Sequence, residues 1–345
     1  MNSILCAIFF LSGAAALTFE QLWFRQAGLA LGNSIWASSL VLAGFMGGLA
    51  IGNGIMARFG HRVRRPVALY AGLELAIAVT GISLVHLLPM LSPLLSPILR
   101  PVLEIPLAVN AIRLGSAFLL LLVPSAAMGA TLPLLVAALH RRHQQFGRAL
   151  GLLYGWNTLG AVVGVVVGEV VLIDQFGIRT TAWVAGGVNL AAAGLAWMAS
   201  RRLDVSGESA ISAPLAPIPP RALWFLAAAF VAGGSLLGLE VVWFRFLVLF
   251  VHGTSLTFAV MLGVVLLGIG LGGLAGSRWL AFRRDAHRNV FGIVLSCGAV
   301  VVATYAGFTH VLTASPPQNE FGFSAFYYAL PLMLPVALFS GTLFT

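Results

Sequence analysis

The chain has 345 residues, of which 60% are apolar and only 8% are charged, and its mean hydropathy is +1.00. This composition excludes ordinary soluble domains and predicts an all-α, polytopic helical membrane protein. The formal net charge of +9 comes entirely from arginine, because the sequence contains no lysine. The arginines lie in short loops between apolar spans, as the positive-inside rule requires, so we predict a lipid bilayer and no nucleic acid as partner.

Apolar stretches of the length that crosses a bilayer as a helix, about 20 residues, follow one another along the whole chain. They cover residues 4–31, 34–57, 67–90, 110–139, 149–173, 180–200, 222–250, 255–281, 290–312 and 323–345. The proline-rich segment 89–106 predicts a broken helix instead of a regular span, because proline removes helical hydrogen bonds.

Arginine clusters follow the second, fourth, sixth and eighth spans, whereas the opposite loops hold little beyond Arg100 and Arg179. This asymmetry places the N-terminus and the basic loops in the cytoplasm. The predicted location is therefore a bacterial-type inner (plasma) membrane, crossed many times by the chain.

The motif Glu20-Gln-Leu-Trp-Phe-Arg25 recurs 220 residues later as Glu240-Val-Val-Trp-Phe-Arg245. The same offset pairs Gly13 with Gly233, Gly48 with Gly268, Gly52 with Gly272, Arg58 with Arg278 and Arg64 with Arg284. A unit of six spans returns the chain to the same side of the membrane, so the two halves are parallel. That is a major-facilitator-like arrangement of two six-helix bundles.

The repeat predicts a first six-helix bundle at 1–200, a proline-rich cytoplasmic linker at 201–221 and a second bundle at 222–345. Segment 124–131 of the fourth span corresponds to 335–342, so the second bundle is incomplete, with about four helices. We expect a fragment of a longer protein, truncated after about ten spans, or a chain that a partner completes.

Glycines at four-residue spacing line one face of three spans and predict close helix packing. The helix-packing sets are Gly44, Gly48 and Gly52; Gly160, Gly164 and Gly168; and Gly268, Gly272 and Gly276. A second interpretation makes these faces sliding contacts between the bundles.

Charged and polar residues inside the apolar spans are the candidates for function, because charge in hydrocarbon is costly. Glu20 and Arg25 lie about 140° apart around a helix, so each needs a partner elsewhere. One interpretation is structural, with cross-helix salt bridges. The other is a pathway in which Glu20, Glu240 or Glu74 binds a cation or a proton and Trp23 and Trp243 form aromatic walls. The predicted pathway comprises Glu20, Trp23, Arg25, Glu74, Tyr154, Asn157, Glu240, Trp243 and Arg245.

Two further polar residues, Glu169 and Asn189, lie in the fifth and sixth spans, and we rank Glu169 below Glu74 because it is close to the end of its span. No phosphate-binding loop, nucleophile elbow or metal-ligand spacing occurs in the sequence. We therefore predict no catalytic residue, no metal and no cofactor.

Four stretches resemble the membrane domain of the fused major-facilitator/spermidine-synthase family. They are Ser12-Gly-Ala-Ala-Ala-Leu-Thr-Phe-Glu-Gln-Leu-Trp-Phe-Arg25, Arg62-Val-Arg-Arg-Pro66, Met128-Gly-Ala-Thr-Leu-Pro133 and Gly151-Leu-Leu-Tyr-Gly-Trp-Asn-Thr-Leu-Gly-Ala161. The resemblance implies a facilitator-like bundle, which in this family commonly precedes a cytoplasmic aminopropyltransferase-like domain. No residue of this chain matches that domain, so whether the protein is part of an enzyme stays open.

Two functional hypotheses follow from the sequence. The first is a transporter for a small cationic or amine-type solute of polyamine-like chemistry, with proton coupling through a buried acid. The second is a membrane anchor or scaffold for a spermidine-synthase-like transferase domain outside this chain, with purely structural intramembrane charges.

Overall fold

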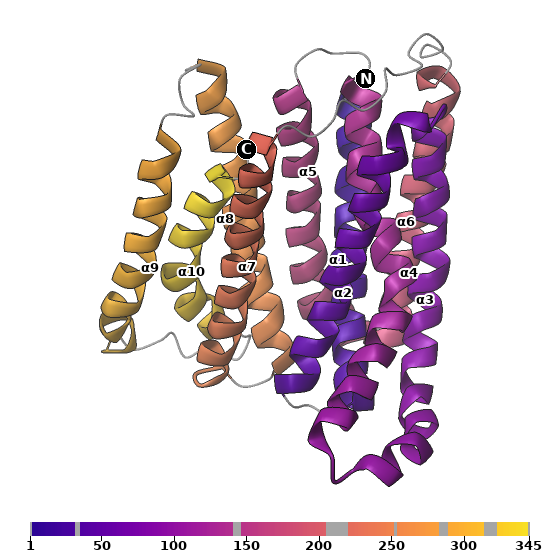
Figure 1. The fold of residues 1–345 in the computed structure, drawn as a ribbon, viewed down its shortest axis with the longest axis vertical. Helices are drawn as coiled ribbons and strands as arrows, with labels where there is room; N and C mark the ends of the chain where they lie inside the picture. Colours follow the sequence, from indigo (N-terminus) through magenta and orange to yellow (C-terminus); the bar gives the residue numbers. More distant parts are fainter. Residues whose placement is uncertain are drawn as a thin grey trace. The chain divides into compact units, whose positions relative to one another are not determined.

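The computed structural model describes residues 2–31, 35–140, 146–204, 220–251, 254–282, 289–313 and 323–343. Within those ranges the chain is helical and contains no strand, so the predicted all-α fold is confirmed (Figure 1). The α-helices are α1 (Asn2–Leu31), α2 (Ile35–Phe59), α3 (Pro66–Leu99), α4 (Pro106–His140), α5 (Phe146–Val167), α6 (Asp174–Leu203), α7 (Pro220–Val248), α8 (Thr254–Phe282), α9 (Val290–Thr313) and α10 (Phe323–Leu343). Short 3-10 segments η1 (Gly60–Arg62) and η2 (Arg100–Val102) and a π-helical segment η3 (Gly168–Ile173) connect some of them.

Helices long and apolar enough to cross a bilayer make up most of the described chain. Nine such segments meet criteria of length and composition, and one of them, Gly151–Leu203, covers both α5 and α6. The chain is therefore a multi-pass membrane protein whose environment is a lipid bilayer.

Two compact units divide the chain at the predicted linker: unit 1 is Met1–Ala210 and unit 2 is Ile211–Thr345. Unit 1 holds α1 to α6 and unit 2 holds α7 to α10. Residues 205–219 of the predicted linker lie outside the described residues, whereas both ends of that linker are helical, since α6 continues to Leu203 and α7 begins at Pro220.

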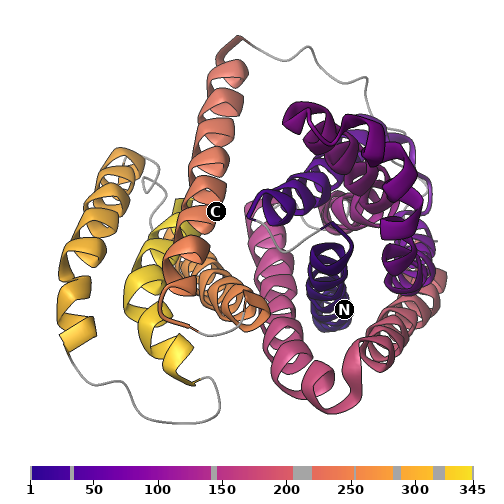
Figure 2. The ribbon, with the colours of Figure 1, turned by 90° about the horizontal axis from the view of Figure 1, so that it is seen from below.

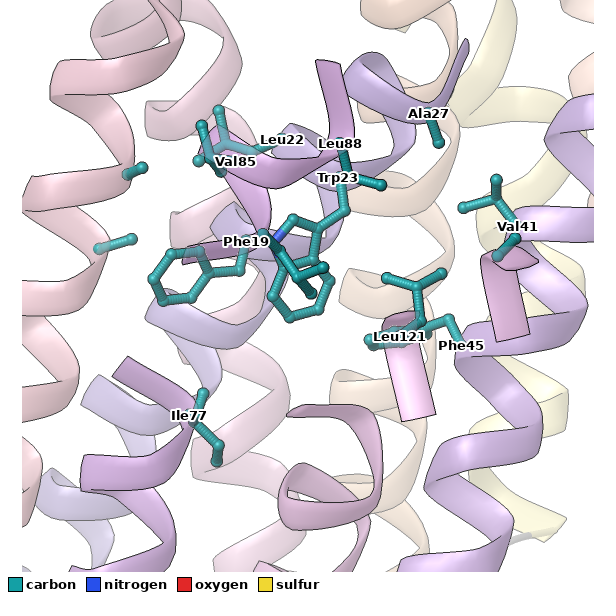
Figure 3. Close-up of a cluster of buried hydrophobic side chains, with 14 of the residues drawn as sticks. Phe19, Leu22, Trp23, Ala27, Val41, Phe45, Ile77, Val85, Leu88 and Leu121 are labelled. Atoms are coloured by element: carbon teal, nitrogen blue, oxygen red, sulfur yellow. The ribbon is translucent and has the colours of Figure 1, made fainter. Parts of the chain in front are cut away.

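Helix α1 occupies the centre of unit 1, and the other five helices of the unit surround it (Figure 2). Its most buried part packs into an apolar cluster with α2, α3 and α4 (Figure 3). In that cluster Trp23 stacks on Phe19, with ring centroids 5.6 Å apart, and meets Phe45 of α2 at 6.2 Å. A helix that is mostly apolar around its whole circumference is expected to be buried in this way.

The predicted glycine faces lie where helices approach most closely. A Cβ atom added to Gly160 or Gly164 would overlap the main-chain carbonyl oxygen of Phe10 or Ala14, so α5 packs against α1 backbone to backbone. Residue numbers rise together along the two helices, from Phe10 beside Gly160 to Ala14 beside Gly164, so α1 and α5 run parallel. These glycines therefore pack within unit 1, as the first interpretation of the glycine faces expects.

The α2–α4 contact of unit 1 recurs as the α8–α10 contact of unit 2. A Cβ on Gly52 would overlap the carbonyl oxygen of Ala126, and a Cβ on Gly272 would overlap that of Leu338. Two more pairs repeat in the same way: Gly48 with Ser125 becomes Gly268 with Ala337, and Gly129 with Leu49 becomes Gly341 with Ile269. The offset is 220 for the first helix of each pair, as in the sequence repeat, and 212 for the second. The sequence alignment of 124–131 with 335–342 is thus displaced by one residue from the alignment of the contacts.

Helices α7 and α9 are much less covered than their counterparts α1 and α3. In the most apolar 18-residue stretch of each helix, the buried share is 11% for α7 and 0% for α9, whereas it is 56% for α1 and 44% for α3. In unit 1 the covering helices are α5, which packs on α1, and α6, which packs on α1 and α3. Among the described residues of unit 2, no helix follows α10 to take those two places.

The proline-rich segment corrects one prediction, because α3 continues through Pro89, Pro93 and Pro97 as a helix to Leu99. The three prolines recur every four residues and are all exposed, so the lost hydrogen bonds lie on one open face. The break follows later, at η2.

Asp204, which follows the last residue of α6, caps the N-terminus of α3. Its carboxylate accepts hydrogen bonds from the backbone N–H groups of Val67 (3.3 Å) and Ala68 (3.0 Å). These are two of the N–H groups that a helix start leaves without a helical acceptor. The contact ties the end of the sixth helix to the start of the third.

Asp204→Ala is expected to lower the stability of unit 1 by about 1 kcal/mol, the usual cost of losing an N-cap oxygen. Asp204→Asn keeps one acceptor oxygen and is expected to lose less. Thermal midpoints of the purified variants in one detergent measure the difference. Equal midpoints for the wild type and Asp204→Ala would show that the cap contributes nothing.

Candidate functional site

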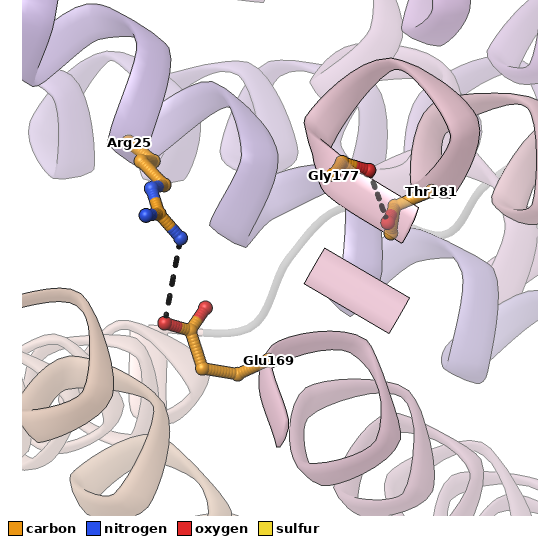
Figure 4. Close-up of polar contacts among 4 residues, drawn as sticks. All are labelled: Arg25, Glu169, Gly177 and Thr181. Carbon is orange, nitrogen blue, oxygen red and sulfur yellow. Dashed lines mark hydrogen bonds and ion pairs between the residues drawn. The ribbon is translucent and has the colours of Figure 1, made fainter. Parts of the chain in front are cut away.

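Arg25 and Glu169 form an ion pair between α1 and the π-helical segment η3. Arg25 Nη1 lies 3.8 Å from Glu169 Oε1 (Figure 4). The Arg25 side chain is 39% exposed, whereas that of Glu169 is only 9% exposed. The pair therefore lies at the edge of the unit 1 interior and joins α1 to the chain after α5, as the structural interpretation of Arg25 expects.

Local backbone geometry explains why Glu169 points back at α1. It is the second residue of η3, where the helix widens to the π form, a feature often found at functional sites. Gly168, just before it, faces Thr18 and Gln21 of α1. Further along the chain, Gly177 has a φ of 73° and kinks α6 near its start. Thr181 Oγ1 donates a hydrogen bond to the Gly177 carbonyl at 2.8 Å (Figure 4).

Glu20 and Gln21 lie next to each other in the buried part of α1, with relative exposures of 6% and 3%. The side-chain amide of Gln21 has no hydrogen-bond partner among the described residues, although its oxygen lies close to Gly168. A buried amide without a partner is costly. Together with the Arg25–Glu169 pair, these groups make the last turns of α1 the most polar part of the helix in the apolar span.

Trp23 packs inside unit 1. Its side chain is 1% exposed and lies in the apolar cluster (Figure 3). It also donates a hydrogen bond from Nε1 to the Gly81 carbonyl of α3 at 3.2 Å, an acceptor that the sequence could not identify. These contacts give Trp23 a structural role, and its predicted role as an aromatic wall stays a prediction.

Tyr154, Asn157 and Thr158 lie on α5, near the place where that helix meets α1. The Asn157 side-chain oxygen and carbonyl lie directly against Gly13. Thr158 Oγ1 donates to the Tyr154 carbonyl within the same helix, at 2.8 Å. Asn157 therefore belongs to the α1–α5 contact, and the predicted place of Tyr154 and Asn157 in a pathway stays a prediction.

Glu74 is fully buried in the middle of unit 1, with 0% exposure. Ser12 Oγ of α1 donates a hydrogen bond to Glu74 Oε1 at 2.5 Å. Tyr70, one turn earlier on α3 and also 0% exposed, lies beside the carboxyl and Ser12 but outside hydrogen-bond geometry. Sequence reasoning selected Glu74 and missed Ser12 and Tyr70. The four-residue spacing from Tyr70 to Glu74 was a signal that could have found one of them.

Asn189 on α6 is a second buried polar residue of unit 1, with 0% exposure and no hydrogen-bond partner for its amide in the described part of the chain. It belongs to α6, which packs on both α1 and α3. The interior of unit 1 thus contains polar groups from at least three helices.

In unit 2 the repeated motif lies on α7. Glu240 is 8% exposed and Trp243 is 0% exposed, whereas Arg245 is exposed. The burial of the acid and the indole therefore repeats that of Glu20 and Trp23. The Trp243 indole N–H has no hydrogen-bond acceptor among the described residues, unlike that of Trp23.

Comparison with known proteins gives no relative to guide the interpretation of these residues. No family model, no curated protein and no solved structure matches the chain.

Proposed function

We propose that this chain is a transporter-type membrane domain that moves a small cationic or amine-type solute. The observation that carries the proposal is the burial of Glu20 and Glu240 at the same place of two structurally repeated helices, with exposures of 6% and 8%. Carboxylates inside apolar spans are rare and usually serve a substrate, an ion or a proton. Parallel repeats of this kind are a common architecture of membrane transporters.

The wider setting belongs to the same proposal. The arginine asymmetry supports a cytoplasmic N-terminus in a bacterial-type inner membrane. The four quoted motifs support membership of the major-facilitator/spermidine-synthase family, with the membrane domain as the part present here. A positively charged amine is the solute that two buried carboxylates would select by charge.

A second candidate is the membrane anchor or scaffold of a spermidine-synthase-like transferase. The packing of Trp23 and the Arg25–Glu169 pair favours it, because both are structural contacts within unit 1. In that case the acids of α1 and α7 would stabilise helix packing and move nothing.

Uptake of labelled polyamines into proteoliposomes that contain the full chain, with and without a pH gradient, separates the two candidates. We expect saturable uptake that falls at least tenfold in Glu20→Gln combined with Glu240→Gln. Glu104→Gln, which removes an exposed carboxylate from the turn after η2, is the matched control and is expected to keep uptake. No saturable uptake, or equal uptake in the double variant and the control, would favour the scaffold.

A further inference from the structure

A group of three side chains in the interior of unit 1 takes no part in the proposed transport by Glu20 and Glu240. It consists of Ser12 on α1 and of Tyr70 and Glu74 on α3, with exposures of 5%, 0% and 0%. Ser12 donates to Glu74 Oε1 at 2.5 Å, and Tyr70 lies beside both groups. We refer to these residues as the hydroxyl–carboxyl triad.

Among the described residues, no cation balances the carboxyl of Glu74. In the part of the chain that the structure describes, no arginine or histidine side chain forms an ion pair with it. The elements packed against α3 are α1, α4 and α6, together with the short segment η2. The titratable groups of α1 lie more than one helical turn from Ser12; they are Cys6, Glu20 and Arg25. The described titratable groups of the other elements lie near the ends of those elements: Arg113 in α4, Asp174, Arg179, Arg201 and Arg202 in α6, and Arg100 in η2. On α3 itself the other titratable group of the span, His86, is exposed and contacts the Ile82 carbonyl.

A charge on Glu74 would have little compensation in this interior. An ionised Glu74 would place a negative charge in an apolar interior with one hydrogen bond, from Ser12 to Oε1, while Oε2 has no hydrogen-bond partner among the described residues. An un-ionised Glu74 keeps the hydrogen bond from Ser12 and removes the buried charge. The cost of burying charge therefore favours the un-ionised acid.

We propose that Ser12, Tyr70 and Glu74 form an intramembrane proton-binding site, in which Glu74 is held as an un-ionised acid. Binding converts the Glu74 carboxylate and one proton from water into the carboxylic acid, with no other bond made or broken. Release of the proton leaves a carboxylate with two hydroxyl donors, so release requires water or a cation to reach the interior of unit 1. The site belongs to unit 1 alone and does not depend on whether the chain moves a solute.

Infrared difference spectroscopy of the full chain, reconstituted in lipid at neutral pH, tests the site directly. We expect the wild type to show the carbonyl band of an un-ionised carboxylic acid, and Glu74→Gln to lose one component of it. Ser12→Ala is expected to shift that component because it removes the hydrogen bond to Glu74 Oε1, and Tyr70→Phe is expected to shift it because it removes the hydroxyl beside the carboxyl. Glu104→Gln, which changes an exposed carboxylate, is expected to leave the band unchanged.

A carboxylic acid band that is identical in the wild type and Glu74→Gln would overturn the proposal. If Glu74→Gln does not fold, the wild type alone decides through a hydrophobic carbodiimide, which modifies un-ionised carboxyl groups in membranes. An adduct on the peptide that contains Glu74 then supports the site, and its absence overturns it. Both readouts are independent of uptake, so failure of the transport proposal leaves this result unaffected.

Discussion

Replacement of Gly52 by leucine is expected to prevent unit 1 from folding into its native bundle. The added Cβ would overlap the carbonyl oxygen of Ala126 on α4, which is a main-chain atom and cannot rotate away. Overpacking that side chains can absorb costs about 1–3 kcal/mol, and a backbone overlap must separate the two helices. We expect a loss of at least about 3 kcal/mol, measured as the folded fraction after purification in mild detergent.

Gly54, two residues later on the same helix, is the matched control. It is exposed and has no heavy atom within 4 Å of an added Cβ among the described residues. Leucine at position 54 is expected to be neutral, or slightly stabilising through helix propensity. If Gly52→Leu and Gly54→Leu yield the same folded fraction, the close α2–α4 contact does not exist in the membrane-embedded protein.

The glycine spacing predicted which faces pack closely but not which helices they meet. Four-residue spacing places Gly44, Gly48 and Gly52 on one side of α2, and this follows from helical geometry alone. That the partner is α4 depends on how all the helices of unit 1 arrange around α1, which no local pattern contains. The proposed sliding role required partners in the other bundle, and the contacts of Gly52 and Gly272 instead lie within their own units.

The charged residues show the same division between local and tertiary information. The helical angle between Glu20 and Arg25 correctly indicated that Arg25 needs a partner from another helix. The partner, Glu169, depends on the parallel packing of α5 on α1 and on the π-helical segment that follows, and the sequence gives no sign of that segment. The acceptor of the Trp23 indole, the Gly81 carbonyl, could not be predicted either, because it is a backbone group of a helix far away in sequence.

Substitutions at Gly13 and Gly233 are expected to have opposite outcomes, although the two glycines are equivalent in the sequence repeat. Gly13→Leu would drive a side chain into the Asn157 carbonyl and separate α1 from α5. We expect a loss of at least about 3 kcal/mol from unit 1, measured as the thermal midpoint and folded fraction in detergent. Gly233→Leu is expected to be tolerated, because nothing among the described residues lies within 4 Å of its added Cβ.

This pair separates sequence equivalence from structural equivalence. Gly13 follows the same apolar motif as Gly233, and Phe10 and Phe230 occupy the same place before them. In unit 1 the carbonyl of Phe10 meets Gly160 of α5, whereas Phe230 is 83% exposed. If Gly233→Leu unfolds the chain as strongly as Gly13→Leu, then a helix covers α7 in the membrane as closely as α5 covers α1. In that case the exposed face of α7 packs against another helix, and α7 is as buried as α1.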